Sequence, residues 1–256
     1  MVSQSVITMM IVSGIVAILV PIILVIFGVV KLKVKMKPVT LGIVTFIVFA
    51  VILEQVVHAF VTRTSVWEYP AFRIPYSALM AGIFEEGGRF LVMTYLLKKF
   101  RDWKDGFAFG LGHGGIESIL ILGLSSFSNI FIAFQINSGN FDKMMTPQTK
   151  DALMMTKKAI LNITVFDLSL ASIERLCALA LQIALAIFVM YAVKSGKLSY
   201  LFYAIGIHAL CDLPAAFYQT GYLSLVPVEI MLIVIAVGSV WYIIKSKNTF
   251  KKTSSL

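Results

Sequence analysis

The chain has 256 residues, of which 59% are hydrophobic and only 14% are charged. A soluble domain is about half apolar and about one-quarter charged, so this composition excludes an ordinary soluble protein and indicates a lipid environment. In a soluble protein the net charge of +9 would suit a nucleic-acid partner. Here the basic residues flank apolar segments, where they orient a membrane protein, so we expect no nucleic-acid binding.

Seven segments are long and apolar enough to cross a bilayer, which takes about twenty residues. The first is too long for the apolar region of a cleavable signal peptide and has no basic residues before it. We therefore expect an all-α integral membrane protein, a bundle of about seven transmembrane helices in a single polytopic domain over 1–256. The spans are expected near 6–30, 39–61, 77–97, 106–131, 165–193, 199–218 and 222–244, and 245–256 as a short polar cytoplasmic tail.

Basic residues predict the orientation of this bundle. The segments after the first, third, fifth and seventh spans hold 14 of the 22 Lys and Arg residues. Cytoplasmic loops carry such an excess, so we expect the N-terminus outside and the C-terminus in the cytoplasm. The expected location is a cell membrane that the chain crosses several times. The basic residues are Lys31, Lys33, Lys35, Lys37, Lys98, Lys99, Arg101, Lys104, Lys194, Lys197, Lys245, Lys247, Lys251 and Lys252.

Ionisable residues stand in the middle of five of these apolar segments. A charged side chain at the centre of a span costs about 2.5–3.5 kcal/mol on insertion scales. Such residues normally face the interior of a bundle or a watery cavity, and they mark functional sites. They are Glu54, His58, Glu85, Glu86, Arg89, His113, Glu117, Glu174, Arg175, His208 and Asp212.

Spacing groups most of these residues into polar clusters on single helix faces. Residues three or four apart in a helix are neighbours on its surface. The three clusters are Glu85-Glu86-Arg89, His113-Glu117 and His208-Asp212.

The paired glutamates suit the activation of water. Two adjacent carboxylates in a low-dielectric site do not both ionise easily, so one of them holds a proton more firmly. A glutamate of this kind can act as a general base near neutral pH, while Arg89 keeps the other carboxylate ionised and in place. Physical chemistry alone treats Glu85 and Glu86 as one coupled pair.

The histidines suit either of two roles. His113 and His208 can donate hydrogen bonds to an oxyanion, or they can bind a metal. Asp212 can fix the tautomer of His208, and Glu117 is expected to support the site by pairing. No cofactor is certain; a divalent metal such as zinc, with Glu85, His113 and His208 as candidate ligands, is left open.

The pattern of these residues resembles a known group of membrane proteases. The runs Glu85-Glu86-Gly-Gly-Arg89, Phe109-x-x-x-His113 and His208-x-x-x-Asp212 are similar to three motifs of the CAAX-protease and bacteriocin-processing superfamily. The Gly-His-Gly-Gly-Ile-Glu run ending at Glu117, with the Glu174-Arg175 pair, more specifically resembles its bacterial YhfC family branch. The resemblance extends from about the second span to the sixth. One departure is Gln182, at a position where YhfC-like chains tend to have histidine.

This resemblance implies an intramembrane endopeptidase whose substrate is a membrane protein or peptide. It also implies that Glu85 is the water-activating base and that His113 and His208 support the oxyanion. The expected catalytic residues are Glu85, Glu86, His113 and His208, supported by Arg89, Glu117 and Asp212. The superfamily includes members described as metalloproteases and members described as metal-independent glutamate proteases, and the sequence leaves both open.

Two other functions remain open at this stage. Charged residues in spans also mark the pathways of proton- or ion-coupled transporters, and a relative of these proteases can be a catalytically silent membrane scaffold. Glu54 and His58, four residues apart, are expected to form a satisfied buried pair outside the site. Neither the substrate nor the oligomeric state follows from the sequence.

Overall fold

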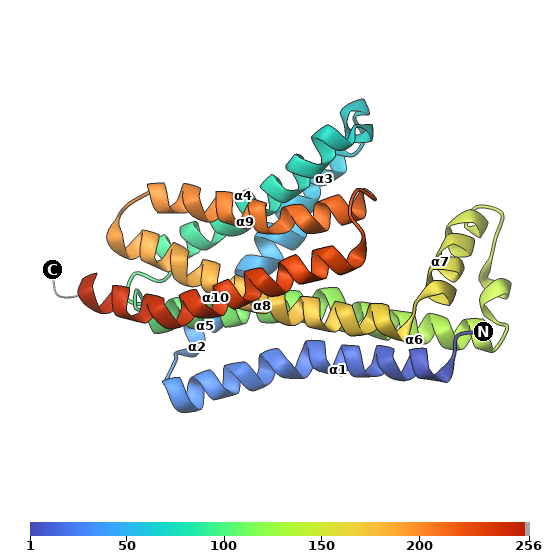
Figure 1. Cartoon of the computed structure of the whole chain (residues 1–256), viewed down its shortest axis with the longest axis horizontal. Coiled ribbons are helices and arrows are strands. Elements are labelled where there is room, and N and C mark those ends of the chain that lie inside the picture. The colour runs from blue at the N-terminus through green and yellow to red at the C-terminus, as the bar shows by residue number, and fades with distance from the viewer. Residues whose placement is uncertain (254–256) are drawn as a thin grey trace. The chain divides into compact units, whose positions relative to one another are not determined.

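The computed structural model describes residues 1–253, and over these residues the chain is helical, without strands (Figure 1). The α-helices and the short 3-10 or π-helical elements (η) follow one another with short connections. In chain order they are α1 (Gln4–Phe27), η1 (Gly28–Leu32), α2 (Met36–Thr45), η2 (Phe46–Glu54), α3 (Gln55–Val61), η3 (Ser65–Glu68), α4 (Pro70–Tyr95), α5 (Trp103–Ser118), η4 (Ile119–Gly123), α6 (Leu124–Asn137), η5 (Phe141–Met144), α7 (Lys150–Asn162), α8 (Val165–Ser195), α9 (Ser199–Gln219) and α10 (Leu225–Thr253).

Within residues 1–253, six stretches of helix are long and apolar enough to cross a membrane, which confirms an all-helical membrane protein. They are Gln4–Leu32, Met36–Val61, Trp103–Asn137, Val165–Ser195, Ser199–Gln219 and Leu225–Lys251. These stretches correspond in order to six of the seven expected spans. The last one runs past the expected end at 244, because α10 stays helical as far as Thr253. Residues 254–256 of the expected tail lie outside the described residues.

The remaining expected span, 77–97, falls mainly in α4. This helix has 26 residues, and at about 1.5 Å per residue it is long enough to cross. It is less apolar than the other spans because Glu85, Glu86 and Arg89 stand in its second half. The count of seven spans and the orientation of the termini therefore stay predictions.

The chain packs as two compact units. One consists of Met1–Val20 and Ser118–Leu176, and the other of Pro21–Glu117 together with the chain from Cys177 onward. The first unit is held by an apolar cluster that includes Met10 and Ala133. All seven expected site residues belong to the second unit, and the single domain over 1–256 remains a prediction.

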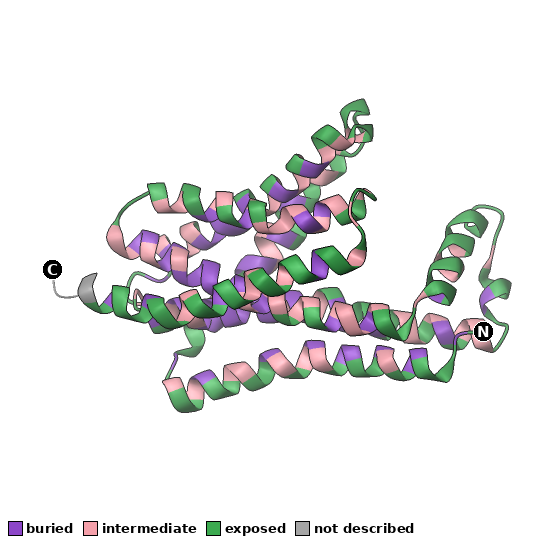
Figure 2. Ribbon diagram, viewed as in Figure 1, coloured by how far each residue is buried: buried purple, intermediate pink, exposed green. Residues whose placement is uncertain are grey.

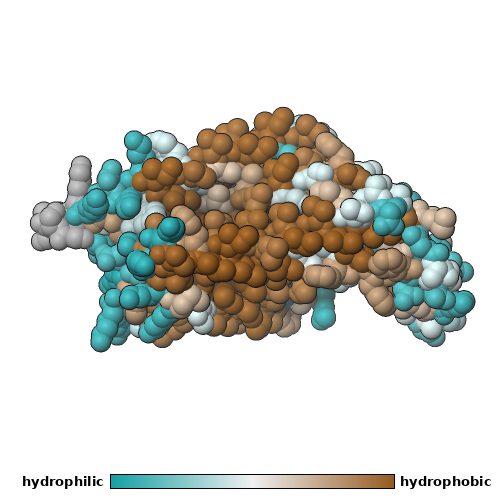
Figure 3. Space-filling model, turned by 90° about the horizontal axis from the view of Figure 1, so that it is seen from below, coloured by the Kyte–Doolittle hydropathy of each residue, from teal (hydrophilic) through white to brown (hydrophobic). Residues whose placement is uncertain are grey.

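Apolar side chains cover much of the outer surface of the spans. Ile23, Phe127 and Val234 are each more than half exposed, and many large apolar residues resemble them. In the space-filling view, brown apolar side chains extend over most of the visible face (Figure 3). A soluble protein rarely exposes apolar surface on this scale, whereas helices in lipid do so by necessity.

Two features of the second unit determine where polar side chains can be buried. The part of α8 from Leu179 to Val193 is buried almost without interruption, so this stretch is surrounded on all sides (Figure 2). Helices α4 and α9 lie side by side, and a Cβ on Gly82 would stand 2.8 Å from the carbonyl oxygen of Ile205 (Figure 1). Polar residues facing these contacts must therefore pair within the protein.

The second expected span is partly π-helical. Residues Phe46–Glu54 form η2 between α2 and α3, and π-helical segments of this kind occur frequently at functional sites. The ring of Phe49 packs on α4, where a Cβ on Gly88 would lie 2.5 Å from it. The small residue at position 88 thus lets η2 approach the helix that carries the paired glutamates.

Candidate active site

Four helices of the second unit supply the polar side chains of the site. Because α4, α5, α8 and α9 approach closely, side chains from all four converge in the interior. Glu85, Glu86 and Arg89 come from α4, His113 and Glu117 from α5, Gln182 from α8, and His208 and Asp212 from α9. Residues from all three sequence clusters therefore lie together, and Gln182 joins them.

Arg89 holds the two glutamates together. Its Nη1 donates to Oε1 of Glu86 at 2.7 Å, and its Nη2 donates to Oε2 of Glu85 at 3.0 Å. The guanidinium is fully buried, as is the Glu86 side chain. A buried charge is tolerated when it is paired and hydrogen-bonded, and one guanidinium between two carboxylates meets that condition.

Each histidine pairs with a different carboxylate of this pair. Nε2 of His113 donates to Oε2 of Glu85 at 2.9 Å, and Nδ1 of His208 donates to Oε1 of Glu86 at 2.6 Å. The other ring nitrogen of His208, Nε2, lies 3.4 Å from Oδ2 of Asp212. His208 and Asp212 thus lie within ion-pair distance, although this distance is longer than an ordinary hydrogen bond.

Gln182 connects three of the charged residues. Its Oε1 accepts a short hydrogen bond from Nη2 of Arg89. Its Nε2 donates to Oε2 of Glu85 at 3.0 Å and to Oε2 of Glu117 at 2.6 Å. The carboxamide is suited to this place because it is both donor and acceptor. The sequence alone did not predict a role for Gln182. The one feature that marked this residue is an amide side chain within a long apolar segment.

Close helix contacts bring His113 to the glutamates. A Cβ on Gly42 of α2 would lie 2.2 Å from the carbonyl oxygen of Phe109, one turn before His113. A Cβ on Gly114 of α5 would lie 2.8 Å from the side chain of Gln182. Packing explains both glycines. A larger residue at position 42 would push α2 away from α5, and a larger residue at position 114 would push α5 away from α8.

Three buried polar atoms in this cluster have no hydrogen-bond partner among residues 1–253. They are Oε2 of Glu86, Nε of Arg89 and Nδ1 of His113. Buried polar atoms are nearly always paired, and each exception calls for an explanation such as a catalytic role. Three such atoms in one network make this cluster the candidate site.

Glu85 and Glu86 differ in their access to solvent. The Glu85 side chain is 9% exposed, whereas the Glu86 side chain is 0% exposed. Three donors converge on Oε2 of Glu85, from Arg89, His113 and Gln182. Its second oxygen, Oε1, has no hydrogen-bond partner among the described residues. Of the pair, only Glu85 therefore combines an oxygen without a partner among the described residues with some exposed surface.

Glu54 and His58 form the pair that their spacing predicts. Nε2 of His58 donates to Oε1 of Glu54 at 3.0 Å. Nδ1 of His58 lies 3.1 Å from the hydroxyl of Tyr76, whose ring stacks on Phe72 near the start of α4. Glu54 is also within electrostatic reach of Glu85. The pair thus extends from the neighbourhood of the site toward one end of α4.

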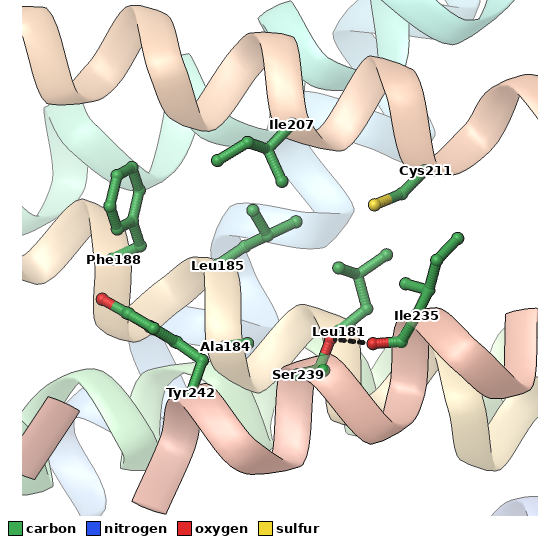
Figure 4. Close-up of a pocket in the computed structure, with 10 residues that line it drawn as sticks. Leu181, Ala184, Leu185, Phe188, Ile207, Cys211, Ile235, Ser239 and Tyr242 are labelled. Carbon is green, nitrogen blue, oxygen red and sulfur yellow. Dashed lines mark hydrogen bonds between the residues drawn. The ribbon is translucent and has the colours of Figure 1, made fainter. Parts of the chain in front are cut away.

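The unit also contains an apolar cavity of about 290 Å³ between α8, α9 and α10 (Figure 4). Leu181, Phe188 and Ile207 are among its ten lining residues, none of which is a carboxylate or an imidazole. The hydroxyl of Ser239 donates to the carbonyl oxygen of Ile235 in its own helix, as the dashed line shows. This cavity therefore has the chemistry of a lipid-facing space and not of a catalytic site.

The pair Glu174-Arg175 lies in the other unit. Adjacent residues of a helix normally point apart, yet Nη2 of Arg175 makes a short ion pair with Oε1 of Glu174.

The fold and the buried polar cluster define a multi-pass membrane protein with an ionisable site between its helices. The model of the family described as YhfC intramembrane metalloprotease matches residues 16–247 of the chain. The chain is also 42% identical, over 258 residues, to the uncharacterized membrane protein YhfC of Bacillus subtilis (strain 168), covering 98% of this chain and 100% of that protein. The chain belongs to the YhfC intramembrane metalloprotease family. No solved structure matches it.

The family description implies a metal, and the side chains can be tested for one. Carboxylates and imidazoles are common zinc ligands, so the donor types are suitable. Their arrangement is not, because no three His, Cys, Asp or Glu side chains within residues 1–253 lie together so as to hold an ion. The Arg89 cation bonds to both glutamates, and His113 and His208 pair with different carboxylates. The residues as arranged do not fit a metal.

Proposed function

We propose that this protein is an intramembrane endopeptidase in which Glu85 activates water against a peptide bond of a membrane-associated protein or peptide. Membership of a family of membrane proteases supports the reaction class. We also propose that the protein lies in the bacterial cytoplasmic membrane. The placement in the wider CAAX-protease and bacteriocin-processing superfamily, and the glutamate mechanism associated with it, belong to the proposal as well.

The observation that carries the assignment is the asymmetry of the two glutamates. Oε2 of Glu85 accepts three hydrogen bonds that fix the orientation of the carboxylate. Oε1 is left for a water molecule, and the side chain is the more exposed of the pair. A general base must lie within hydrogen-bond reach of the proton that it removes, and Glu85 meets this requirement better than Glu86.

The reaction proceeds in two proton-balanced steps. A water molecule donates one proton to Oε1 of Glu85 while its oxygen attacks the carbonyl carbon of the substrate. The carbonyl oxygen becomes an oxyanion. When the tetrahedral intermediate collapses, the C–N bond breaks and the proton on Glu85 passes to the leaving amine. Glu85 is then free to act again.

The two histidines take different parts in this scheme. Nε2 of His113 is occupied by Glu85, so His113 orients the base. Nε2 of His208 is only loosely held by Asp212 at 3.4 Å, and Asp212 is 35% exposed. The His208 Nε2–H is therefore the donor that we assign to the oxyanion. Asp212 keeps the ring oriented, and Glu86 with Arg89 supplies the charges around it.

The test is a comparison of protein termini in membranes from cells with the wild-type protein and cells with Glu85→Gln. Protease function predicts specific new termini that disappear in the variant while the level of the protein stays unchanged. Identical sets of termini would contradict the proposal. A scaffold would show the same indifference to Glu85→Gln but would respond to changes in its surface loops.

One observation favours a second candidate, a proton-coupled transporter. Two hydrogen bonds join Glu54, His58 and Tyr76 in the second unit, and chains of such groups serve as proton relays in transporters. This function predicts proton-dependent uptake into proteoliposomes, reduced by Glu54→Gln, with no new peptide termini.

A further inference from the structure

A cavity of about 260 Å³ lies between η3, the first half of α4 and the last turns of α9. Unlike the apolar cavity beside α10, it is lined by polar as well as apolar groups. Its polar side chains come from Trp67, Arg73, Ser77, Gln219 and Thr220, and none of its lining residues is a carboxylate.

The polar lining is dominated by groups that donate hydrogen bonds. Arg73 and the indole nitrogen of Trp67 can only donate, and Ser77 and Gln219 can donate as well. None of these four side chains makes a hydrogen bond or ion pair with a described residue. The hydroxyl of Thr220 is already bonded to the carbonyl oxygens of Ala216 and Phe217. The cavity thus presents one positive charge and several unused donors.

Arg73 is half-buried and held at this place by the start of α4. Its backbone nitrogen bonds to the carbonyl oxygen of Tyr69, which places it in the first turn of the helix. The amino end of a helix carries a partial positive charge, which adds to that of the guanidinium. A planar guanidinium fits the two oxygens of a carboxylate in a fork-to-fork arrangement.

The cavity shares the α4–α9 contact with the catalytic cluster. On α9, His208, Asp212, Ala216 and Gln219 recur at helical spacing and so lie on one face. From His208 to Ala216 the distance along the helix is about 12 Å, and from Ile74 to Glu85 on α4 it is about 16 Å. An extended peptide rises about 3.3 Å per residue, so four or five residues would cover this distance.

We propose that this cavity is a substrate subsite that binds a carboxylate of the peptide segment, four or five residues from the bond that is cut. The inference rests on the proposed protease function, and it adds a class of substrate to it. Arg73 is the specificity-determining residue, and Trp67, Ser77 and Gln219 supply the remaining donors. A lipid phosphate has related chemistry, but a guanidinium that lines a cavity beside the catalytic helices is placed for peptide and not for the surrounding bilayer.

Binding can be measured without cleavage. The protein is placed in nanodiscs of phosphatidylcholine, which has no net charge, and titrated with the peptide N-acetyl-Leu-Glu-Leu-amide. The signal is tryptophan fluorescence, and the contribution of Trp67 is identified by comparison with Trp67→Phe. The matched peptide is N-acetyl-Leu-Gln-Leu-amide, which lacks only the charge. The test variant is Arg73→Gln, and the control is Arg63→Gln, an exposed arginine between α3 and η3 that does not line the cavity.

The proposal predicts saturable binding of the glutamate peptide, weakened about tenfold or more by the change to glutamine in the peptide. The change Arg73→Gln weakens binding similarly, and Arg63→Gln leaves it unchanged. Equal binding of both peptides, no binding of either, or no effect of Arg73→Gln would overturn the proposal. In nanodiscs containing phosphatidylglycerol, loss of peptide binding would show that the lipid headgroup occupies the cavity. That result would also overturn the proposal.

The same titration on Glu85→Gln separates this inference from the proposed function. Binding that persists in Glu85→Gln, while cleavage is lost, supports both proposals. If Glu85→Gln cleaves normally and the Arg73-dependent binding is intact, the subsite stands and the glutamate mechanism fails. If cleavage depends on Glu85 but both peptides bind equally, the mechanism stands and the subsite fails.

Discussion

Gln182 of α8 donates a hydrogen bond from Nε2 to Oε2 of Glu85 on α4, across 3.0 Å in the buried interior of the second unit. The same amide accepts from Arg89 and donates to Glu117, so one neutral side chain links two carboxylates and a guanidinium. This relationship makes Gln182 part of the site, and it explains how charges from α4 and α5 are held at fixed separations.

Replacing Gln182 by leucine should reduce cleavage about 10- to 100-fold, because Glu85 loses one of three donors and Arg89 loses an acceptor. The buried groups left unpaired should also lower stability by about 1–3 kcal/mol. Gln182→His retains a donor and should keep more activity than Gln182→Leu. Thermal unfolding and cleavage rates of both variants check this, with Leu185→Met as a volume-matched control on the same helix. Cleavage at the wild-type rate by Gln182→Leu would show that Gln182 does not position Glu85 for the reaction.

Arg89→Met should destabilise the protein by about 3–5 kcal/mol, because it leaves two carboxylates buried without their common counter-ion. Arg89→Lys should restore only part of the loss, since an ammonium lacks the fork that reaches Glu85 and Glu86 together. The measurement is thermal unfolding in detergent. In a double-mutant cycle, Arg89→Met should cost less stability in a Glu86→Gln background than in the wild type. Strictly additive effects would show that the two residues are not coupled.

Gly42→Ala should disturb the site from a distance. Its Cβ would stand 2.2 Å from the carbonyl oxygen of Phe109, so α2 and α5 must separate and carry His113 away from Glu85. We expect a loss of about 1–3 kcal/mol in stability, as for other overpacked positions, together with lower activity. Gly87→Ala is the matched control, since nothing lies within 4 Å of a Cβ there. If Gly42→Ala and Gly87→Ala change stability and activity equally, the site does not depend on the close approach of α2 to α5.

The arrangement of side chains makes a prediction about metal. Because His113 and His208 pair with different glutamates, purified protein should contain less than one bound metal ion per chain, and His113→Ala should not change that content. Elemental analysis of the purified protein checks this. One metal ion per chain that disappears in His113→Ala would show that the imidazoles and carboxylates rearrange around an ion.

The spans and the three polar clusters could be predicted from the sequence, because hydropathy over twenty residues and the three-to-four-residue helix period are local properties. The pairing of Arg89 with both glutamates follows from that period alone. What could not be predicted is which clusters meet across helices. His113 and Glu117 share a face, yet His113 bonds to Glu85 and Glu117 to Gln182, because contacts between helices decide the partners.

The difference between the two glutamates was also beyond the sequence. Glu85 and Glu86 are chemically identical neighbours, and only the packing of α5, α8 and α9 against α4 leaves the side chain of Glu85 9% exposed and that of Glu86 fully buried. The polar cavity at Arg73 was missed for a similar reason. Its lining comes from segments about 140 residues apart in the chain, and no local pattern joins them.

The most direct test of the account is the rate at which purified protein in proteoliposomes cleaves a substrate identified from the membrane termini. Glu85→Gln should lower the rate by about 100-fold or more, the range of a lost general base. Glu86→Gln should retain measurable cleavage, and Asp151→Asn, an exposed change on α7, should behave as wild type. Cleavage at the wild-type rate by Glu85→Gln would contradict the central claim that this carboxylate activates the water.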